Sequence, residues 1–322
     1  MNQHWSEIKE QKTGNLRLKT LLLVNEIFGR KILKIIMFPI IFSIFIFSKS
    51  ARTSSRKYLE KIHKIKSTHK KPAKEANFIE IFFHIFSFAE ALVDKATSWS
   101  GKINSDQINV KNREVFDLVM KDLEQNNPPL LICSHLGNIE VLRAVTNLFS
   151  QKNSKQIIKI HSIVQGSHST KFNSFLKKLN PKYNENITTT SEIGIDSIIK
   201  LKEKLQQGEM IVIAGDRTSS GNEHRSIPVN FLGDKAFFPI GPFVMATTME
   251  CPIYFINCVK SENGGFELYL YKPITVLKSN RKERMSNIES LTQEYSKELE
   301  RLCLLYPNQW YNFFDFWKIP EN

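Results

Sequence analysis

The chain lacks the short motifs that mark several large enzyme classes. It contains no H-E-x-x-H, G-x-S-x-G, G-x-x-x-x-G-K-[ST] or G-x-G-x-x-G pattern. These absences argue against a zinc protease, a serine hydrolase of the nucleophile-elbow type and the common nucleotide-binding loops. No D-x-D pair occurs either, which argues against a metal-dependent sugar transferase.

Cysteine is also scarce. The chain has only four, and no two of them form a C-x-x-C pair. They are Cys133, Cys251, Cys258 and Cys303. We therefore expect no disulfide framework and no zinc site, but buried thiols in a protein from a reducing compartment.

Acidic residues are rare in the first 75 residues. This segment holds 17 Lys and Arg but 5 Asp and Glu, so it carries almost all of the net charge of +13. The rest of the chain is nearly neutral, whereas a nucleic-acid-binding protein more often spreads positive charge over its binding face. A basic segment next to an apolar run instead suggests an anionic membrane surface.

That apolar run is IIMFPIIFSIFIFS at residues 35–48, with basic residues on both sides. Its 14 residues fall short of the roughly 20 that a membrane-spanning helix needs, and Pro39 is expected to kink it. We predict an interfacial or half-inserted membrane anchor. A buried core helix is the alternative.

From residue 107 onward, segments with helical periodicity alternate with short apolar segments typical of buried strands. This alternation predicts an α/β protein whose central sheet is covered by helices on both faces. We divide the chain into a basic N-terminal membrane-anchoring segment, residues 1–75, and an α/β domain, residues 76–322. His84 lies in an almost wholly apolar helix predicted for residues 78–95, and we expect it to be a packed core residue.

The first candidate site is SHLGNIE, residues 134–140, directly after a predicted buried strand. Gly137 would keep the backbone close to a bound molecule, and Asn138 is a suitable N-cap for the helix that follows. Because His135 precedes that helix, its ring can fold back towards Glu140. The carboxylate would then orient the imidazole and leave its other nitrogen as a general base. The alternative is a surface histidine beside a helix-capping glutamate.

The second candidate site is AGDRTSSGNEHRSIPVNFLG, residues 214–233, where Asp216, Arg217 and Thr218 again follow a predicted strand. Arg217 is suited to holding a phosphate or carboxylate, and Asp216 is placed to position Arg217 or the His135 region. A polar surface loop is the alternative. Further on, Gly241 begins a predicted helix whose apolar face either lines an acyl pocket or packs into the core.

These segments resemble those of a known protein family. SHLGNIE, an H-x4-E arrangement of His135 and Glu140, resembles the H-x4-D/E motif of the lysophospholipid acyltransferase superfamily. The stretch from GDRT to IPVNFLGDKAFFPIGPFVMATTMECPIYF is similar to the lipid A biosynthesis (lauroyl/myristoyl) acyltransferases, although GDRT stands where those enzymes carry an Asp-Gln pair. HWSEI at residues 4–8 and PNQWYNFFDFW at 307–317 resemble segments of a subgroup found in bacterial lipid and aryl-polyene gene clusters.

The resemblance implies a glycerolipid acyltransferase-like fold with a mixed central sheet and N-terminal membrane-associating helices. It also implies an O-acyltransferase that moves a fatty acyl group from an acyl thioester to a hydroxyl of a lipid or glycolipid. In this interpretation His135 is the general base and Glu140 its orienting partner. The residues expected to bind substrate are Gly137, Asn138, Asp216, Arg217, Thr218 and Gly241.

The same resemblance predicts the surroundings of the enzyme. The acyl donor would be acyl carrier protein or coenzyme A, and neither a metal nor another cofactor is required. The expected partners are anionic membrane lipids, acyl carrier protein and the lipid acceptor, with no nucleic acid, at the cytoplasmic face of a bacterial inner membrane. The alternative function is a non-catalytic, membrane-associated protein of the same fold that binds lipid or acyl carrier protein. The intact His135 and Glu140 favour the enzyme.

Overall fold

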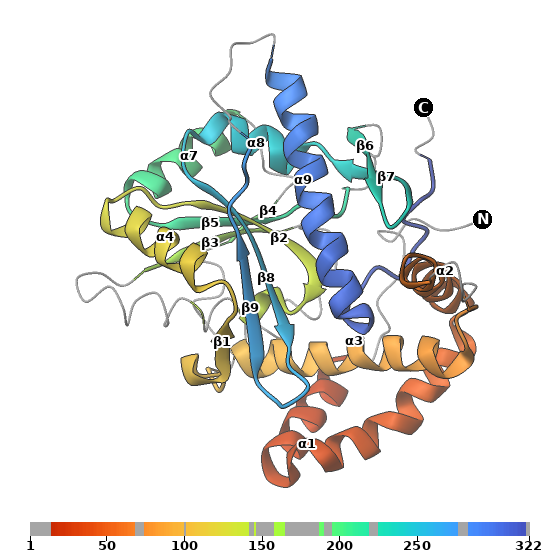
Figure 1. Ribbon diagram of the computed structural model, residues 1–322. Helices are drawn as coiled ribbons and strands as arrows, with labels where there is room; N and C mark the ends of the chain where they lie inside the picture. The colour runs from red at the N-terminus through yellow and green to blue at the C-terminus, as the bar shows by residue number, and fades with distance from the viewer. Residues whose placement is uncertain are drawn as a thin grey trace.

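A central sheet with helices on both faces forms the body of the protein (Figure 1), which confirms the predicted fold class. The computed structural model describes residues 14–67, 74–99, 101–141, 145, 158–164, 187–189, 195–218, 225–275 and 283–319. Its helices are α1 (Gly14–Phe47), α2 (Lys49–Lys66), α3 (Phe78–Trp99), α4 (Arg113–Glu124), α7 (Ile195–Gln206), α8 (Gly241–Met249) and α9 (Arg284–Leu305). Short 3₁₀ turns lie at Ser105–Gln107 (η2), Ile139–Val141 (η3) and Pro307–Gln309 (η6).

The strands form two sheets. They are β1 (Ile108–Val110), β2 (Leu130–Gly137), β3 (Ile160–Val164), β4 (Ile187–Thr189), β5 (Met210–Ala214), β6 (Ser226–Phe231), β7 (Asp234–Pro239), β8 (Ile253–Lys260) and β9 (Phe266–Tyr271). Within the described residues the main sheet has the order β1-β9-β8-β2-β5-β3-β4. Neighbours from β8 to β4 pair in parallel, β9 runs antiparallel to β8, and β1 is parallel to β9. The sheet is therefore mixed, as predicted.

Both faces of the sheet are buried, which explains why its central strands read as continuous apolar runs. In β2, Leu130 and Ile132 belong to the core on the side of α8 and α9. Leu131 and Cys133 point the other way, into the core that includes the apolar residues of α4. The four cysteines are unpaired thiols, and all but Cys251 are buried, in agreement with the prediction.

Strands β6 and β7 form a hairpin. A polar surface loop was one interpretation of residues 214–233, but part of this stretch is strand β6. Its strands pair antiparallel from Ser226 with Pro239 to Phe231 with Asp234. The turn residues Leu232 and Gly233 have φ of 51° and 81°, which suits the tight turns that join two antiparallel strands. The hydrophobic residues of β6 alternate with polar ones, and this alternation was a sequence signal for a strand.

The N-terminal helices pack beside α3. The predicted apolar helix at residues 35–48 is the second part of α1, and the break in helical backbone falls at Gly29 (φ 73°, ψ 178°) rather than at Pro39. Phe45 of α1 contacts Phe78 of α3 with ring centroids 4.5 Å apart. In the part of the chain that the structure describes, no single helix is long and apolar enough to cross a membrane. The stretch from Leu23 to the end of α1, taken together with α2, passes that test as a pair bent by 93°.

Gly137 lets β2 end in close contact with β8. Its φ is +72°, and a Cβ built there would lie 2.8 Å from the carbonyl carbon of Cys258 and nearer still to its oxygen. The pairing of β2 with β8 shifts register between Cys133 and Gly137. The strand end that carries His135 is therefore fixed by a backbone contact that has no room for a side chain.

We predict that Gly137→Ala lowers the free energy of unfolding by about 3 kcal/mol, because it combines left-handed backbone strain with a clash against β8. Gly233→Ala is the matched control. It has a similar φ of +81° but open space around its Cβ, so it should cost only the backbone strain of about 1–2 kcal/mol. Urea denaturation in detergent measures both, and equal losses would show that the contact with β8 is unimportant.

Candidate active site

His135 and Asp216 meet because they follow two adjacent parallel strands. In the pairing of β2 with β5, Cys133 lies opposite Ala214, and the N–H of Gly215 donates to the carbonyl of Cys133 at 2.8 Å. His135 and Asp216 each come two residues after that matched pair. They thus lie at the same level, at the carboxyl edge of the sheet, where α/β proteins usually carry their sites.

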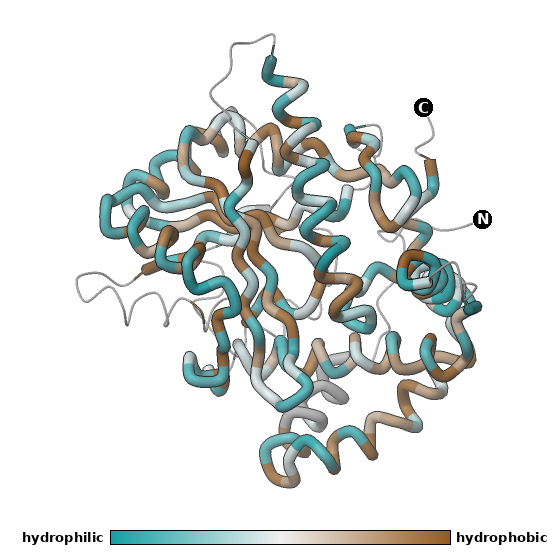
Figure 2. The backbone as a smooth tube through the Cα atoms, viewed as in Figure 1, coloured by the Kyte–Doolittle hydropathy of each residue, from teal (hydrophilic) through white to brown (hydrophobic). Residues whose placement is uncertain are grey.

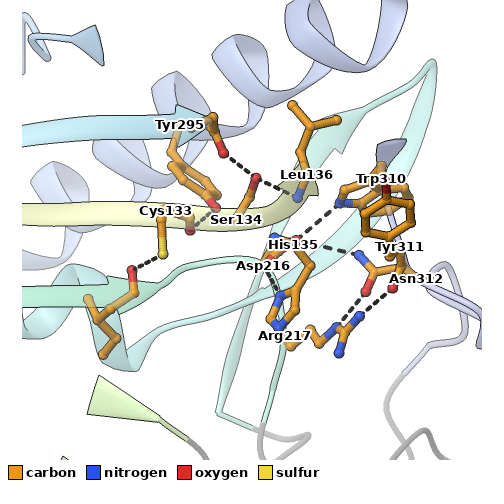
Figure 3. A network of polar contacts seen from close by, with 12 residues as sticks. Cys133, Ser134, His135, Leu136, Asp216, Arg217, Tyr295, Trp310, Tyr311 and Asn312 are labelled. Carbon is orange, nitrogen blue, oxygen red and sulfur yellow. Dashed lines mark hydrogen bonds and ion pairs between the residues drawn. The ribbon is translucent and has the colours of Figure 1, made fainter. Parts of the chain in front are cut away.

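A buried carboxylate holds the His135 ring (Figure 3). His135 Nδ1 lies 2.7 Å from Asp216 Oδ1, and the backbone N–H of His135 donates to Asp216 Oδ2 at 2.9 Å. The Asp216 side chain is 0% exposed, whereas 33% of the His135 side chain is accessible. Within the described part of the chain, His135 Nε2 has no hydrogen-bond partner. One ring nitrogen is therefore fixed and the other is available to a bound molecule.

The pKa shifts favour an ionised Asp216 beside a neutral His135. Burial raises the pKa of Asp216, but His135 and Arg217 outweigh burial and lower that pKa to about 2. Burial lowers the pKa of His135 below 6.5, Arg217 and Lys95 lower it further, and Asp216 only partly offsets them. At neutral pH the ring must then donate Nδ1–H to the carboxylate, because an ionised carboxylate can only accept. Nε2 keeps its lone pair and can act as a base.

The segment after α9 closes over this pair. Trp310 Nε1–H donates to Asp216 Oδ2 at 3.0 Å, and Asn312 Nδ2 lies 3.5 Å from the same oxygen. The N–H of Tyr311 donates to the backbone carbonyl of His135 at 3.1 Å. Leu136 and Trp310 form an isolated antiparallel bridge. The chain thus returns to the end of β2 and surrounds Asp216 with donors (Figure 3).

The Arg217 guanidinium donates hydrogen bonds to the segment after α9. Its Nε donates to Asn312 Oδ1 at 2.6 Å, one Nη donates to the carbonyl of Tyr311, and the guanidinium lies 5.9 Å from the ring centroid of Phe314. Burial lowers the pKa of Arg217 to about 10, with Asp216 acting in the opposite direction, so the group is a cation at neutral pH. The sequence suggested that Asp216 positions Arg217 or the His135 region, and the structure places its carboxylate against the His135 ring.

The predicted pairing of Glu140 with His135 is not confirmed. The carboxylate on His135 Nδ1 is that of Asp216. Glu140 Oε1 lies 2.8 Å from Lys95 Nζ of α3, and the Glu140 N–H donates to Asn138 Oδ1 at 3.1 Å. Asn138 therefore caps the turn as predicted, and Glu140 joins that turn to α3.

The other predicted site residues have mixed surroundings. The N–H of Asn138 donates to the carbonyl of Cys258 at 2.7 Å, and its side-chain amide donates to the carbonyl of Ala91 at 3.2 Å. Gly241 is the exposed first residue of α8, a helix whose Phe243 packs in the core against Tyr295. Thr218 is the last described residue before residues 219–224, which the structure does not describe. Substrate binding by Gly137, Asn138, Thr218 and Gly241 stays a prediction.

A comparison with protein families identifies the type of protein to which this site belongs. The family model for bacterial lipid A biosynthesis acyltransferases matches residues 74–319, which is most of the chain and includes both strand ends and the closing segment. The chain belongs to this family. No curated protein matched the chain. Membership supports transfer of an acyl group to a lipid acceptor. The finer likeness to the gene-cluster subgroup stays a prediction.

Among the described residues, no group of three or more His, Cys, Asp or Glu side chains is arranged to hold a metal ion.

His84, predicted to be a packed core residue, is 0% exposed and contacts Ser55 and the carbonyl of Trp310, which confirms that prediction.

Trp310, Asn312 and Lys95 also belong to the site, although no sequence motif marked them as site residues. PNQWYNFFDFW carried the signal for the first two, because so many aromatic residues in eleven positions indicate a buried segment rather than a chain end. What that segment covers depends on the strand order of the sheet, which no local pattern encodes. Lys95 is missed because it lies on α3, more than one element before His135.

We predict that His135 titrates below 6.5. It should be neutral at pH 7 and become protonated only as the pH falls through its lowered pKa. Asp216→Asn should lower this pKa further, because it removes the charge that raises it. Glu140→Gln should leave the pKa within a few tenths of a pH unit of the wild-type value. NMR of ring-labelled histidine, assigned with His135→Gln, measures all three. A larger change in Glu140→Gln than in Asp216→Asn would restore Glu140 as the partner.

Proposed function

We propose that this protein is an O-acyltransferase that moves a fatty acyl group from the thioester of acyl carrier protein or coenzyme A to a hydroxyl of a lipid or glycolipid. The observation that carries the proposal is the His135–Asp216 pair, in which an accessible, neutral imidazole lies against a fully buried carboxylate. Family membership independently supports acyl transfer to a lipid.

In the proposed reaction, His135 Nε2 takes the proton of the acceptor hydroxyl while its oxygen attacks the thioester carbonyl carbon. Asp216 accepts the Nδ1–H bond throughout and stabilises the imidazolium that forms. The tetrahedral intermediate then collapses, the C–S bond breaks, and the imidazolium returns the proton to the departing thiolate. The products are an ester and a free thiol, and His135 is again neutral.

The remaining predicted residues have supporting roles in this proposal. Glu140 fixes the turn after His135 through Lys95 rather than orienting the ring. The N–H of Asn138 donates to the carbonyl of Cys258, so we do not assign it to the oxyanion of the intermediate. Arg217 is the cation beside the pair, and we propose that it stabilises the developing oxyanion.

We also propose that the protein works on a membrane surface. The second part of α1 presents large exposed hydrophobic residues: Ile32, Ile35, Ile36, Phe38, Ile40, Phe42, Ile44, Ile46 and Phe47. Phe78, Ile79 and Phe83 of α3 are exposed as well. Together these residues form an apolar surface, and apolar surfaces of this kind mark membrane or partner sites in soluble proteins.

The basic residues of α2 also support binding to an anionic membrane surface. Figure 2 contrasts the hydrophobic second part of α1 with the hydrophilic α2 that follows its bend. The exposed basic residues of α2 include Lys49, Arg56, Lys64 and Lys66. Each contributes about 1 kcal/mol of attraction when it lies near an anionic lipid surface. The cytoplasmic face of a bacterial inner membrane is the location that we propose.

We predict that His135→Ala reduces acyl transfer by at least roughly 10²-fold, because general-base catalysis is worth about 10²- to 10⁴-fold. The measurement is release of free thiol from acyl carrier protein or coenzyme A thioesters, with bacterial lipid extract in detergent and mass analysis of the lipid.

His161→Gln is the control for that loss. His161 lies in β3 with Nε2 2.7 Å from Thr188 Oγ1, so this variant should fold and retain activity. Full activity in a folded His135→Ala protein would remove the base from the mechanism. No thiol release from the wild type across several acyl lengths would instead favour the non-catalytic binding protein.

Membrane binding gives a separate prediction. Ile35→Glu combined with Phe47→Glu should weaken binding to anionic liposomes by roughly 100-fold, since each substitution removes an apolar contact and adds a repelled charge. Ile274→Glu is the matched control, because Ile274 is 83% exposed but lies outside the apolar surface. Sedimentation with liposomes measures the effect, and equal weakening by the control would contradict the assignment of this surface.

A further inference from the structure

Asp216 Oδ2 is the meeting point of three donors from two separate parts of the chain. The backbone N–H of His135 reaches it at 2.9 Å, Trp310 Nε1 at 3.0 Å and Asn312 Nδ2 at 3.5 Å. The other oxygen, Oδ1, accepts from the His135 ring. One oxygen of the carboxylate therefore binds the imidazole, and the other accepts from the backbone of His135 and the side chains of Trp310 and Asn312.

Buried contacts hold both the ring and the backbone of Trp310 in place. It is 0% exposed, and its ring contacts Tyr58, Phe231 and Phe316. Its carbonyl accepts from His84 Nε2 at 2.9 Å. Burial lowers the pKa of His84 to about 4, so this ring stays neutral and donates one Nε2–H bond. The indole N–H therefore points at Asp216 from a rigid support.

Asn312 lies between the two charged side chains of the site. Its Oδ1 accepts from Arg217 Nε at 2.6 Å while its Nδ2 faces Asp216. A cation adjacent in sequence to the carboxylate would otherwise compete with His135 for its oxygens. The amide gives Arg217 a neutral acceptor and leaves Asp216 Oδ1 to the imidazole.

We infer that Trp310 and Asn312 are positioning residues for acyl transfer, which set the orientation and charge of Asp216 and through it those of His135. This inference rests on the proposed function, in which His135 is the base. Neither residue touches the reacting atoms. Their effect passes through the carboxylate, so it must appear in the turnover number and in the titration of His135 rather than in substrate affinity.

Trp310→Phe isolates the indole N–H because it keeps an aromatic ring in the same cluster. Without that donor, Oδ2 loses a bond and more of the carboxylate charge acts on the imidazole, so the pKa of His135 rises. The carboxylate is also freer to turn. The charged groups that face His135 are Asp216, Arg217 and Lys95, and the substitution changes none of them.

The matched control is Trp317→Phe. Trp317 belongs to the same aromatic cluster and contacts Trp310, Phe231 and Phe316, but its Nε1–H donates to the carbonyl of Phe231 at 3.4 Å. Both substitutions remove one indole N–H from the cluster. Only one of those N–H groups reaches Asp216.

The full chain is assayed in detergent by thiol release from an acyl thioester. Trp310→Phe should lower kcat by roughly 10-fold, the rate equivalent of one hydrogen bond to a charged group. KM should stay within about 2-fold, and the acid limb of the kcat profile should move up by about half a pH unit. Asn312→Ala should also lower kcat, and Trp317→Phe should resemble the wild type. Equal kcat in all four proteins, or equal losses in both Trp variants with an unmoved acid limb, would overturn the inference.

An NMR titration of His135 separates this inference from the proposed function. If the wild type transfers no acyl group, the proposed function fails, but the titration still decides the positioning role. A higher His135 pKa in Trp310→Phe than in the wild type and Trp317→Phe supports it. An unchanged pKa in Trp310→Phe overturns it, whatever the activity.

Discussion

The buried charge of Asp216 is the constraint on which the rest of the site depends. An ionised carboxylate that is wholly removed from water costs several kcal/mol unless charged or polar partners compensate it. Here the partners are the His135 ring and backbone, the indole of Trp310 and the amide of Asn312. The pairing of β2 with β5 supplies one side of this set, and the segment after α9 supplies the other.

Local sequence patterns predicted the elements but not all of their partners. Apolar segments such as PLLIC and EMIVI, which precede the two candidate sites, were recognisable as buried strands. His135 and Asp216 were recognised as strand-end residues. Their pairing was one of two roles suggested for Asp216, beside the expected pairing of His135 with Glu140. Only the strand order, which places β5 next to β2, decides between these partners. The contact of Trp310 with Asp216 was harder to predict, because the two residues lie 94 positions apart in the sequence.

Helix α3 connects the two halves of the proposed mechanism. Its Phe78 and Phe82 pack against the apolar second part of α1, and its His84 holds the carbonyl of Trp310. Lys95, near its end, pairs with Glu140 beside the site. One rigid helix therefore joins the apolar surface, the closing segment and the turn after His135. In the proposed function, this arrangement holds His135 at a fixed distance from the apolar surface.

The sequence separations within the site also bear on when it forms. The bonds from His135 to Asp216, from Trp310 to Asp216 and from His84 to Trp310 join residues 81, 94 and 226 positions apart. Contacts of such long range form late, because the chain must close large loops before they stabilise it. Helices such as α1 and α2 need only local contacts. Helices α1 and α2 can therefore form from local contacts, whereas the His135–Asp216 pair requires most of the chain to be assembled.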